Sequence, residues 1–340
     1  MEIYSMCDKY FANIWVTHRC NYRCRYCYVK PILSNCDLSI ETAQEILNFI
    51  AQTIDPKQEL IINFHGGEPT LNFSVIKYIV ETVPSMVGNK VLFGMTTNGS
   101  MLTEESIEYL SKHFKYNLSI SIDGDEHTQT FNRIPITKVP KYNVILENAL
   151  LLQRKTGRVR ARMTFDLENV ADLFSNLKFM IESGFRSIVI SPNIYRSDWK
   201  EEEFAEVSEQ LKRVKQYVQT NNIEGVSLYD IENTFSELSK CTACESYFNF
   251  DVDGLIYPCS FVVGQQDFVV GNAASGLLTE KLAYINKVKN TTIHECADCT
   301  LSPYCLSARC IFANYATTGY FDKPNLVQCN MINIKNILAW

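Results

Sequence analysis

The decisive stretch of the sequence reads Ala12-Asn-Ile-Trp-Val-Thr17-His-Arg-Cys20-Asn-Tyr-Arg-Cys24-Arg-Tyr-Cys27. It begins with a β-rich apolar run, which predicts a strand over Ala12–Thr17. Three cysteines follow directly, and three thiolates can bind three irons of a 4Fe–4S cube. The fourth iron then has an open coordination position, which is where substrate chemistry takes place. The alternative is a zinc site completed by His18 or Cys36.

The cysteine-free middle of the chain alternates short β-rich runs with segments of helical period. Further strands are expected over Glu59–Phe64, Val91–Thr96, Asn117–Ile122, Val159–Phe165 and Arg186–Ser191. Helices are expected after the N-caps Ser39 and Thr103, and over Asn72–Val83, Tyr142–Lys155, Asn169–Ser183 (stopped by Gly184) and Glu201–Thr220. Six strand–helix units predict an α/β fold with a parallel sheet, either open or closed into a partial barrel. Its chemistry belongs at the carboxyl ends of the strands.

Length and composition exclude several classes of protein. The chain has 340 residues, 46% apolar and 21% charged, with a net charge of −6. These values predict a globular protein of about two domains, with no basic run for nucleic acid or an anionic membrane. No apolar stretch is long enough to span a bilayer, and the N-terminus does not resemble a signal peptide. A cytoplasmic protein is expected.

The 13 cysteines are unusual and fall in two groups. Five lie from Cys7 to Cys36 and eight from Cys241 to Cys329, whereas residues 37–240 contain none. In a reducing compartment such groups indicate metal ligands rather than disulfides. We therefore expect a first domain over residues 1–225 and a cysteine-rich domain over 226–340, with the boundary between residues 221 and 240. Long apolar periods are rare in the second domain, so its folding is expected to depend on metal.

The CxxxCxxC spacing, with Tyr26 before the third cysteine, resembles the signature of the radical S-adenosylmethionine (SAM) superfamily. The resemblance implies a partial (β/α)6 barrel of the TIM type, and a 4Fe–4S cluster held by Cys20, Cys24 and Cys27. It also implies that SAM binds the open iron and is cleaved reductively to a 5′-deoxyadenosyl radical, which abstracts hydrogen from a substrate.

Other segments at expected strand ends resemble the same family. Gly66-Gly67-Glu68-Pro69 matches the segment that holds the SAM amino group, and Ser121 matches a position near the ribose. Arg162 is a candidate for the SAM carboxylate, with Arg133 as a second candidate. The resemblance thus implies cofactor contacts from Gly66, Gly67, Glu68, Pro69, Thr97, Asn98, Ser121, Asp123, Arg133 and Arg162. No catalytic residue is assigned.

The C-terminal cysteines, with Gly254-x4-Cys259 among them, resemble the SPASM domain of peptide-modifying radical SAM enzymes. The resemblance implies two auxiliary 4Fe–4S clusters, and so three clusters in all. The first would be held by Cys241, Cys244, Cys259 and Cys310, and the second by Cys296, Cys299, Cys305 and Cys329. Spacing alone leaves the pairing open, as it does two structural zinc sites. Cys7 and Cys36 remain as incidental thiols.

Two activities fit this resemblance. One is an oxidative change, such as a thioether or carbon–carbon cross-link, in a ribosomally made precursor peptide; the other is formylglycine formation by an anaerobic sulfatase maturase. The maturases typically carry a general-base Asp after the cysteine that matches Cys259, and this chain has Ser260. A serine hydroxyl needs its own base, for which Glu245 and Asp251 are candidates. Peptide maturation is therefore favoured, and a non-catalytic iron–sulfur or zinc scaffold is the alternative of another class.

The expected partners follow from the same chemistry. They are a peptide or protein substrate and a reductant such as flavodoxin or ferredoxin, without nucleic acid or membrane. Few residues precede Cys20, so no leader-binding domain is expected. The substrate would then be held in the cleft or presented by a separate leader-binding protein.

Overall fold

The computed structural model describes residues 8–157, 159–229 and 237–338. Its strands are β1 (Lys9–Thr17), β2 (Tyr22–Cys24), β3 (Glu59–Gly66), β4 (Val91–Thr97), β5 (Asn117–Ser121), β6 (Arg133–Pro135), β7 (Val159–Phe165), β8 (Ser187–Pro192), β9 (Ser227–Tyr229), β10 (Tyr247–Phe250), β11 (Leu255–Tyr257), β12 (Gly271–Asn272) and β13 (Gly276–Leu277). In these residues one sheet has 11 strands in the order β13-β12-β11-β10-β1-β3-β4-β5-β7-β8-β9, and β2 and β6 form a separate pair. The strands from β10 to β9 in this order are parallel, so the predicted α/β class with a mostly parallel sheet is confirmed.

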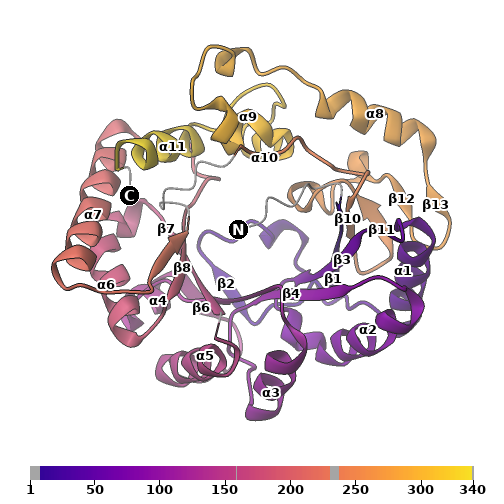
Figure 1. The fold of residues 1–340 in the computed structure, drawn as a ribbon, viewed down its shortest axis with the longest axis horizontal. Helices are drawn as coiled ribbons and strands as arrows, with labels where there is room; N and C mark the ends of the chain where they lie inside the picture. The colour runs from indigo at the N-terminus through magenta and orange to yellow at the C-terminus, as the bar shows by residue number, and fades with distance from the viewer. Residues whose placement is uncertain (1–7, 158, 230–236, 339–340) are drawn as a thin grey trace.

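The sheet curves into an arc, and the helices that connect its parallel strands lie on the outer side (Figure 1). The helices are α1 (Ile40–Thr53), α2 (Phe73–Met86), α3 (Glu104–His113), α4 (Glu126–Asn132), α5 (Tyr142–Thr156), α6 (Leu173–Ser183), α7 (Glu201–Thr220), α8 (Thr279–Lys289), α9 (Leu306–Arg309), α10 (Ile311–Thr318) and α11 (Leu326–Leu338). In the described part of the chain, none of them has the length and hydropathy of a bilayer-spanning helix.

Most predicted elements are confirmed, with small shifts at their ends. Ser39 and Thr103 cap α1 and α3 by accepting hydrogen bonds from backbone amides in the first turn, and Gly184 ends α6 at φ +108°. The first strand begins at Lys9 rather than at Ala12. The helix expected from Asn169 begins as a 3-10 turn over Leu167–Asp172 and becomes α-helical only at Leu173.

The parallel sheet also continues beyond residue 225, where the strand–helix rhythm of the sequence ends. β9 pairs with β8, and β10 pairs with β1 at the other end of the parallel run. One sheet therefore runs through both expected domains, and the division at residues 225 and 226 stays a prediction. Residues 230–236, part of the expected boundary, lie outside the described residues.

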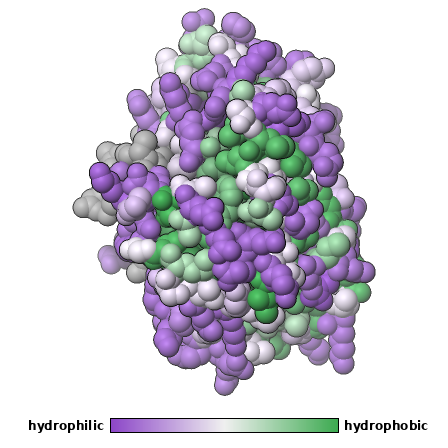
Figure 2. Space-filling view, turned by 90° about the vertical axis from the view of Figure 1, so that its right-hand side faces the viewer, coloured by the Kyte–Doolittle hydropathy of each residue, from purple (hydrophilic) through white to green (hydrophobic). Residues whose placement is uncertain are grey.

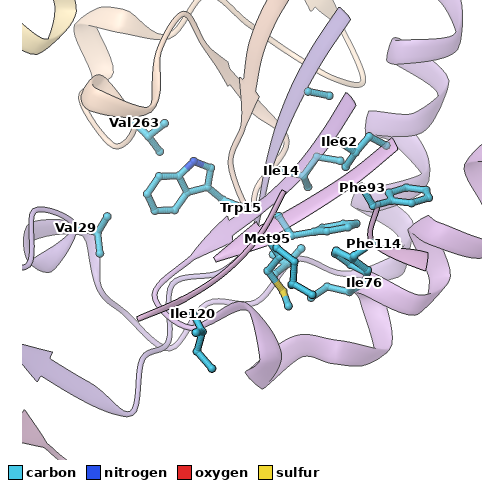
Figure 3. Packing of buried hydrophobic residues seen from close by; sticks show 14 of the residues in the cluster. Ile14, Trp15, Val29, Ile62, Ile76, Phe93, Met95, Phe114, Ile120 and Val263 are labelled. Carbon is cyan, nitrogen blue, oxygen red and sulfur yellow. The ribbon is translucent and has the colours of Figure 1, made fainter. Parts of the chain in front are cut away.

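Alternation along β1 separates two environments. Ile14 points toward the helices and packs with Ile62, Ile76 and other buried side chains, whereas Trp15 points to the inner side of the arc (Figure 3). There Trp15 lies between Val29 of the cysteine loop and Val263 of the C-terminal region. The outer face thus forms the core, and the inner face connects the two cysteine regions.

The C-terminal region crosses the open side of the arc, from β10 beside β1 to α11 beside α7 (Figure 1). It has an aromatic cluster of its own, in which Phe268 lies 5.1 Å from Tyr315 and 6.1 Å from Phe312 between ring centroids. Seen from the side of α1 and α2, the surface is mainly hydrophilic, with hydrophobic residues gathered across its middle (Figure 2).

Candidate functional site

The loop that follows β1 places Cys20, Cys24 and Cys27 at the carboxyl edge of the sheet, near enough for the charges of Cys24 and Cys27 to act on Cys20. Burial raises the pKa of the Cys20 thiol to about 12, and negative charge on Glu68, Cys24 and Cys27 contributes to the increase. Burial likewise raises the pKa of Cys24 to about 11. Three partly buried thiols whose charges oppose one another suit a shared cationic group, because binding an iron stabilises the thiolate form.

Two glycines at the end of β3 allow this loop to approach the sheet closely. A Cβ on Gly66 would lie 2.3 Å from the carbonyl oxygen of Thr17, and one on Gly67 would lie 2.3 Å from that of Arg19. The same oxygens accept hydrogen bonds from the amides of Gly67 (3.0 Å) and Glu68 (2.8 Å). The glycines therefore position the cysteine loop directly, since any side chain at either position would push the loop away.

Glu68 is buried and binds neighbouring protein groups through its carboxylate. The carboxylate accepts hydrogen bonds from the Thr97 hydroxyl (2.6 Å) and the Asn98 amide (2.7 Å), and also from Thr70. Asn98 in turn donates to Asn21 of the cysteine loop at 2.9 Å. The structure thus brings together Glu68, Thr97 and Asn98, three of the expected cofactor residues, in a network that joins the ends of β3 and β4 to the cysteine loop.

Asp123 and Arg133 form a second buried support for the loop. The Arg133 guanidinium donates two hydrogen bonds to the Asp123 carboxylate, at 3.0 and 2.9 Å, and the Tyr26 hydroxyl donates to the same carboxylate. Arg133 lies opposite Cys24 in the small β2–β6 sheet. These contacts bind Tyr26 and Cys24 to the end of β5, so Asp123 and Arg133 position the cysteines.

Ser121 and Arg162 have a different environment from this network. They are partners in the register of β5 and β7, and the Arg162 side chain is exposed on the inner side of the arc. Its positive charge acts on both His65 and Tyr28: it adds to the desolvation that lowers the pKa of His65, and it opposes the desolvation that raises the pKa of Tyr28. Ser121 is buried, so of these two residues only Arg162 presents an exposed polar group on the inner side of the arc.

Several buried polar side-chain atoms on the inner face have no hydrogen-bond partner among the described residues. Within the described residues, Nδ2 of Asn13, Nε1 of Trp15 and both side-chain polar atoms of Asn249 are buried without a hydrogen-bond partner. Asn13 and Asn249 are aligned across β1 and β10, and Asn13 and Asn63 across β1 and β3. A polar ligand or water on this face would satisfy these groups, because buried polar atoms are otherwise costly.

The eight C-terminal thiols fall in two groups whose charges act on one another. Burial raises the pKa of Cys259, with contributions from the charges of Cys310 and Cys241. Burial also raises the pKa of Cys244, and the charge of Cys241 adds to that increase. Lys289 donates to the carbonyl oxygen of Ala243 at 3.2 Å, and its positive charge opposes the increase at Cys241 and Cys244 by lowering their pKa. A cation thus faces the first group.

The second group is more exposed. Burial raises the pKa of Cys296, and charges on Cys305, Cys329 and Cys299 raise it further. Cys299 is exposed, whereas Cys305 is buried. In the described residues, no three His, Cys, Asp or Glu side chains are placed to hold a single metal ion. The donor set in each group is nonetheless the all-thiolate set that a 4Fe–4S cluster takes.

An aromatic stack lies between the two cysteine regions. The rings of Tyr28 and Tyr195 are parallel within 5° at 5.9 Å, and Phe261 lies 6.4 Å from Tyr28. Desolvation raises the pKa of Tyr195, and charges on both Cys27 and Cys259 contribute to the increase. Tyr28 follows Cys27 and Phe261 is two residues after Cys259, so the stack fills the space between the loop and the first auxiliary group.

The two carboxylates considered as substitutes for the missing base have other partners. Glu245 is exposed and pairs with Lys289. Asp251 is buried and accepts a hydrogen bond at 2.6 Å from His18, two residues before Cys20. Neither carboxylate is therefore bound to Ser260.

The comparison with known proteins identifies the family of the N-terminal region, residues 14–180. Residues 14–180 match the model of the radical SAM superfamily. The chain contains a radical SAM domain. Two curated relatives match most of the chain. The first, the radical SAM cyclopropyl synthase TigE of Paramaledivibacter caminithermalis, is 24% identical over 91% of this chain and 70% of its own. The cysteine-type anaerobic sulfatase-maturating enzyme of Clostridium novyi is 23% identical over 85% of this chain and 84% of its own.

Two solved structures share the fold of this chain. Native anSMEcpe with bound AdoMet has a TM-score of 0.79 at 17% identity, covering 96% of this chain and 96% of that one. Streptococcus suis SuiB bound to its precursor peptide SuiA has a TM-score of 0.67 at 15% identity, covering 94% and 76%. The likeness extends beyond residue 225, into the cysteine-rich region.

Several residues of the site carry no signal in the sequence. Asn21 and Tyr195 act through partners that are distant along the chain, whereas His18 and Asp251, considered above as a zinc ligand and as a base, are bonded to each other. Only the position of Asn21 directly after Cys20 marks it as a candidate. Cys36 is exposed, and Cys7 lies outside the described residues.

Proposed function

We propose that this chain is a radical SAM enzyme that oxidatively modifies a peptide, forming a thioether or carbon–carbon cross-link in a ribosomally made precursor. The observation that carries the proposal is the three-thiol loop, held at the carboxyl edge of the sheet by Gly66, Gly67 and the Asp123–Arg133 pair. A cluster held by three cysteines leaves one iron for a ligand, and the adjacent inner face has unpartnered polar groups for such a ligand.

The residues of the chain divide this task. Cys20, Cys24 and Cys27 hold the cluster, and Arg162 binds the SAM carboxylate while Ser121 faces the ribose. Glu68, Thr97, Asp123 and Arg133 position the loop from behind. The bound SAM supplies the radical chemistry. The protein orients the substrate and excludes water.

The C-terminal thiols hold two further 4Fe–4S clusters in this proposal. Cys241, Cys244, Cys259 and Cys310 form the first set, beside the cation of Lys289, and Cys296, Cys299, Cys305 and Cys329 form the second. Cys244 has φ +60°, a conformation that costs a non-glycine residue about 1 kcal/mol and that metal binding would support. Fully ligated clusters suit the removal of the electron left after C–H cleavage.

The aromatic residues between the three loop thiols and the first C-terminal group of thiols support a peptide substrate. The aromatic stack of Tyr28, Tyr195 and Phe261 separates Cys27 from Cys259, and aromatic side chains are common in peptide-binding sites. SuiB and anSMEcpe, which share the fold, have been solved with peptides bound. Peptide maturation is favoured over sulfatase maturation because Ser260 replaces the expected Asp, and the two candidate bases pair elsewhere: Glu245 with Lys289, and Asp251 with His18.

The test is anaerobic reconstitution followed by assays with candidate peptides. Three clusters give about twelve irons per chain, and the enzyme should convert SAM to 5′-deoxyadenosine. Mass spectrometry of a co-expressed precursor peptide should show a loss of two hydrogens. A mass change from cysteine to formylglycine in a sulfatase peptide would instead support the maturase alternative. Two or three zinc ions without SAM cleavage would support a scaffold and refute the proposal.

A further inference from the structure

A surface pocket lies beside the loop that holds the first cluster. Its volume is about 610 Å³, and its lining includes Arg19, Cys20, Arg23, Met101, Ile136 and Lys138. One wall is the cysteine loop and another is the segment that follows β6. The Arg23 guanidinium donates to the carbonyl oxygen of Cys20 at 3.1 Å, so the pocket wall directly contacts the backbone of a cluster ligand.

The pocket is positive although the chain has a net charge of −6. Arg19 is paired with Asp37 at 2.6 Å. Arg23 and Lys138 form no ion pair with a carboxylate of the described residues, and the charge of Arg23 acts on the Cys27 thiol. Residues 18–36 and 133–141, which supply most of the lining, contain no Asp or Glu. An acidic surface would therefore complement this one.

Exposed apolar side chains surround the cations. Met101, Ile134 and Ile136 are 46%, 42% and 49% exposed. Apolar residues with basic neighbours are typical of a protein-binding surface, since the apolar side chains supply contact energy and the charges supply orientation.

The exposed thiol of the second C-terminal group has the opposite charge around it. Cys299 is exposed, and its neighbours Glu295 and Asp298 are exposed as well. Residues 292–305 contain no Lys or Arg. An acidic protein would be repelled at Cys299 and attracted at Cys20.

We propose that the pocket beside Cys20 is the docking surface for an acidic one-electron carrier protein, which reduces the first cluster directly and not through the second auxiliary set. This inference rests on the proposed function, because only a redox cluster at Cys20 needs such a donor. One electron would pass from the flavin hydroquinone of the carrier to the cluster held by Cys20, Cys24 and Cys27. The carrier would then leave with its flavin as the semiquinone.

The test compares a protein donor with a small one. Lys138→Glu reverses a charge in the pocket, and Lys57→Glu makes the same change in the turn before β3, at the opposite edge of the sheet. With reduced bacterial flavodoxin at low ionic strength, Lys138→Glu should raise the KM for flavodoxin about tenfold, and Lys57→Glu should leave it unchanged. With dithionite, which needs no docking surface, both variants should form 5′-deoxyadenosine at the unaltered rate.

Binding gives a second readout that does not need turnover. The Kd for oxidised flavodoxin, measured by fluorescence anisotropy, should rise about tenfold in Lys138→Glu, and added salt should weaken the binding of the unaltered chain more than that of the variant. Equal affinity in both variants would overturn the docking surface. So would an Asp298→Lys variant in which flavodoxin binds more tightly and reduces the enzyme faster. Absence of SAM cleavage with dithionite would refute the proposed function, while the binding data would still decide the surface.

Discussion

The cysteine loop after β1 and the cysteine-rich C-terminal region hold their thiols by different means. In the loop, buried side chains from β3, β4 and β5 fix the backbone around Cys20 and Cys24. The second C-terminal group depends on short helical turns, and Cys299 in it is exposed. The folded chain thus preforms the surroundings of the first three thiols, whereas the second C-terminal group is expected to rely more on bound metal.

Removal of one of the three loop thiols should have the largest effect on SAM cleavage. Cys24→Ala leaves two thiols for the first cluster, so SAM cleavage should fall by at least about a thousandfold. Cys36→Ala, in the same loop but exposed, should retain the activity. Formation of 5′-deoxyadenosine by reconstituted protein measures both. Turnover in Cys24→Ala would overturn the assignment of the site.

Removal of a C-terminal thiol should separate SAM cleavage from substrate modification. Cys310→Ala disrupts the first auxiliary set, and modified peptide should fall about a hundredfold while SAM cleavage stays within about threefold. Mass spectrometry and 5′-deoxyadenosine counts measure the two rates. A parallel loss of both would mean that the C-terminal region supports the loop itself, and that the two regions are not independent.

The sequence predicts the elements better than the contacts between them. The six strands are readable because each has a short apolar run, and α1 and α3 because Ser39 and Thr103 cap them. The pair β2–β6 is not readable, because strands of three residues have no period to recognise. Likewise, β9 and β10 follow the end of the strand–helix rhythm, and only the structure shows that they extend the parallel sheet.

The candidate site shows the same limit. The cysteines are recognisable by spacing, which is local. The partners of Glu68, Asp123 and Arg133 are not, because their hydrogen bonds join residues from separate strands. A motif tells which residues belong to the site, but the division between those that face the ligand and those that support the loop is a property of the folded chain.

The buried support of the loop predicts an effect on stability. Asp123→Asn leaves the Arg133 guanidinium buried without its carboxylate, and should lower the free energy of unfolding by about 3 kcal/mol. Glu105→Gln, which breaks the exposed pair with Lys77, should cause no measurable change. Urea denaturation of the metal-free chain measures both. Equal stability of the two variants would show that the loop is not preformed by the protein.

The smallest predicted effect is the pH dependence of stability that arises from His65, near the end of β3. His65 stacks on Trp15 at 5.8 Å, and burial together with the charge of Arg162 lowers its pKa to about 4. The ordinary value, about 6.5, applies to the unfolded chain. Between pH 6.5 and 4 the unfolded state therefore binds more protons, and stability falls as the pH falls.

Substitution tests whether His65 causes this change of stability with pH. His65→Asn should remove about 2 kcal/mol of the loss of stability between pH 6.5 and 4.5, because Asn does not titrate there. His127→Asn, at an exposed position of α4, should leave the slope unchanged. Urea denaturation of the metal-free protein at several pH values measures it. A slope that persists in His65→Asn would mean that the inner face opens to solvent once the metal is removed, and the contrast between a preformed loop and a metal-dependent C-terminal region would then no longer hold.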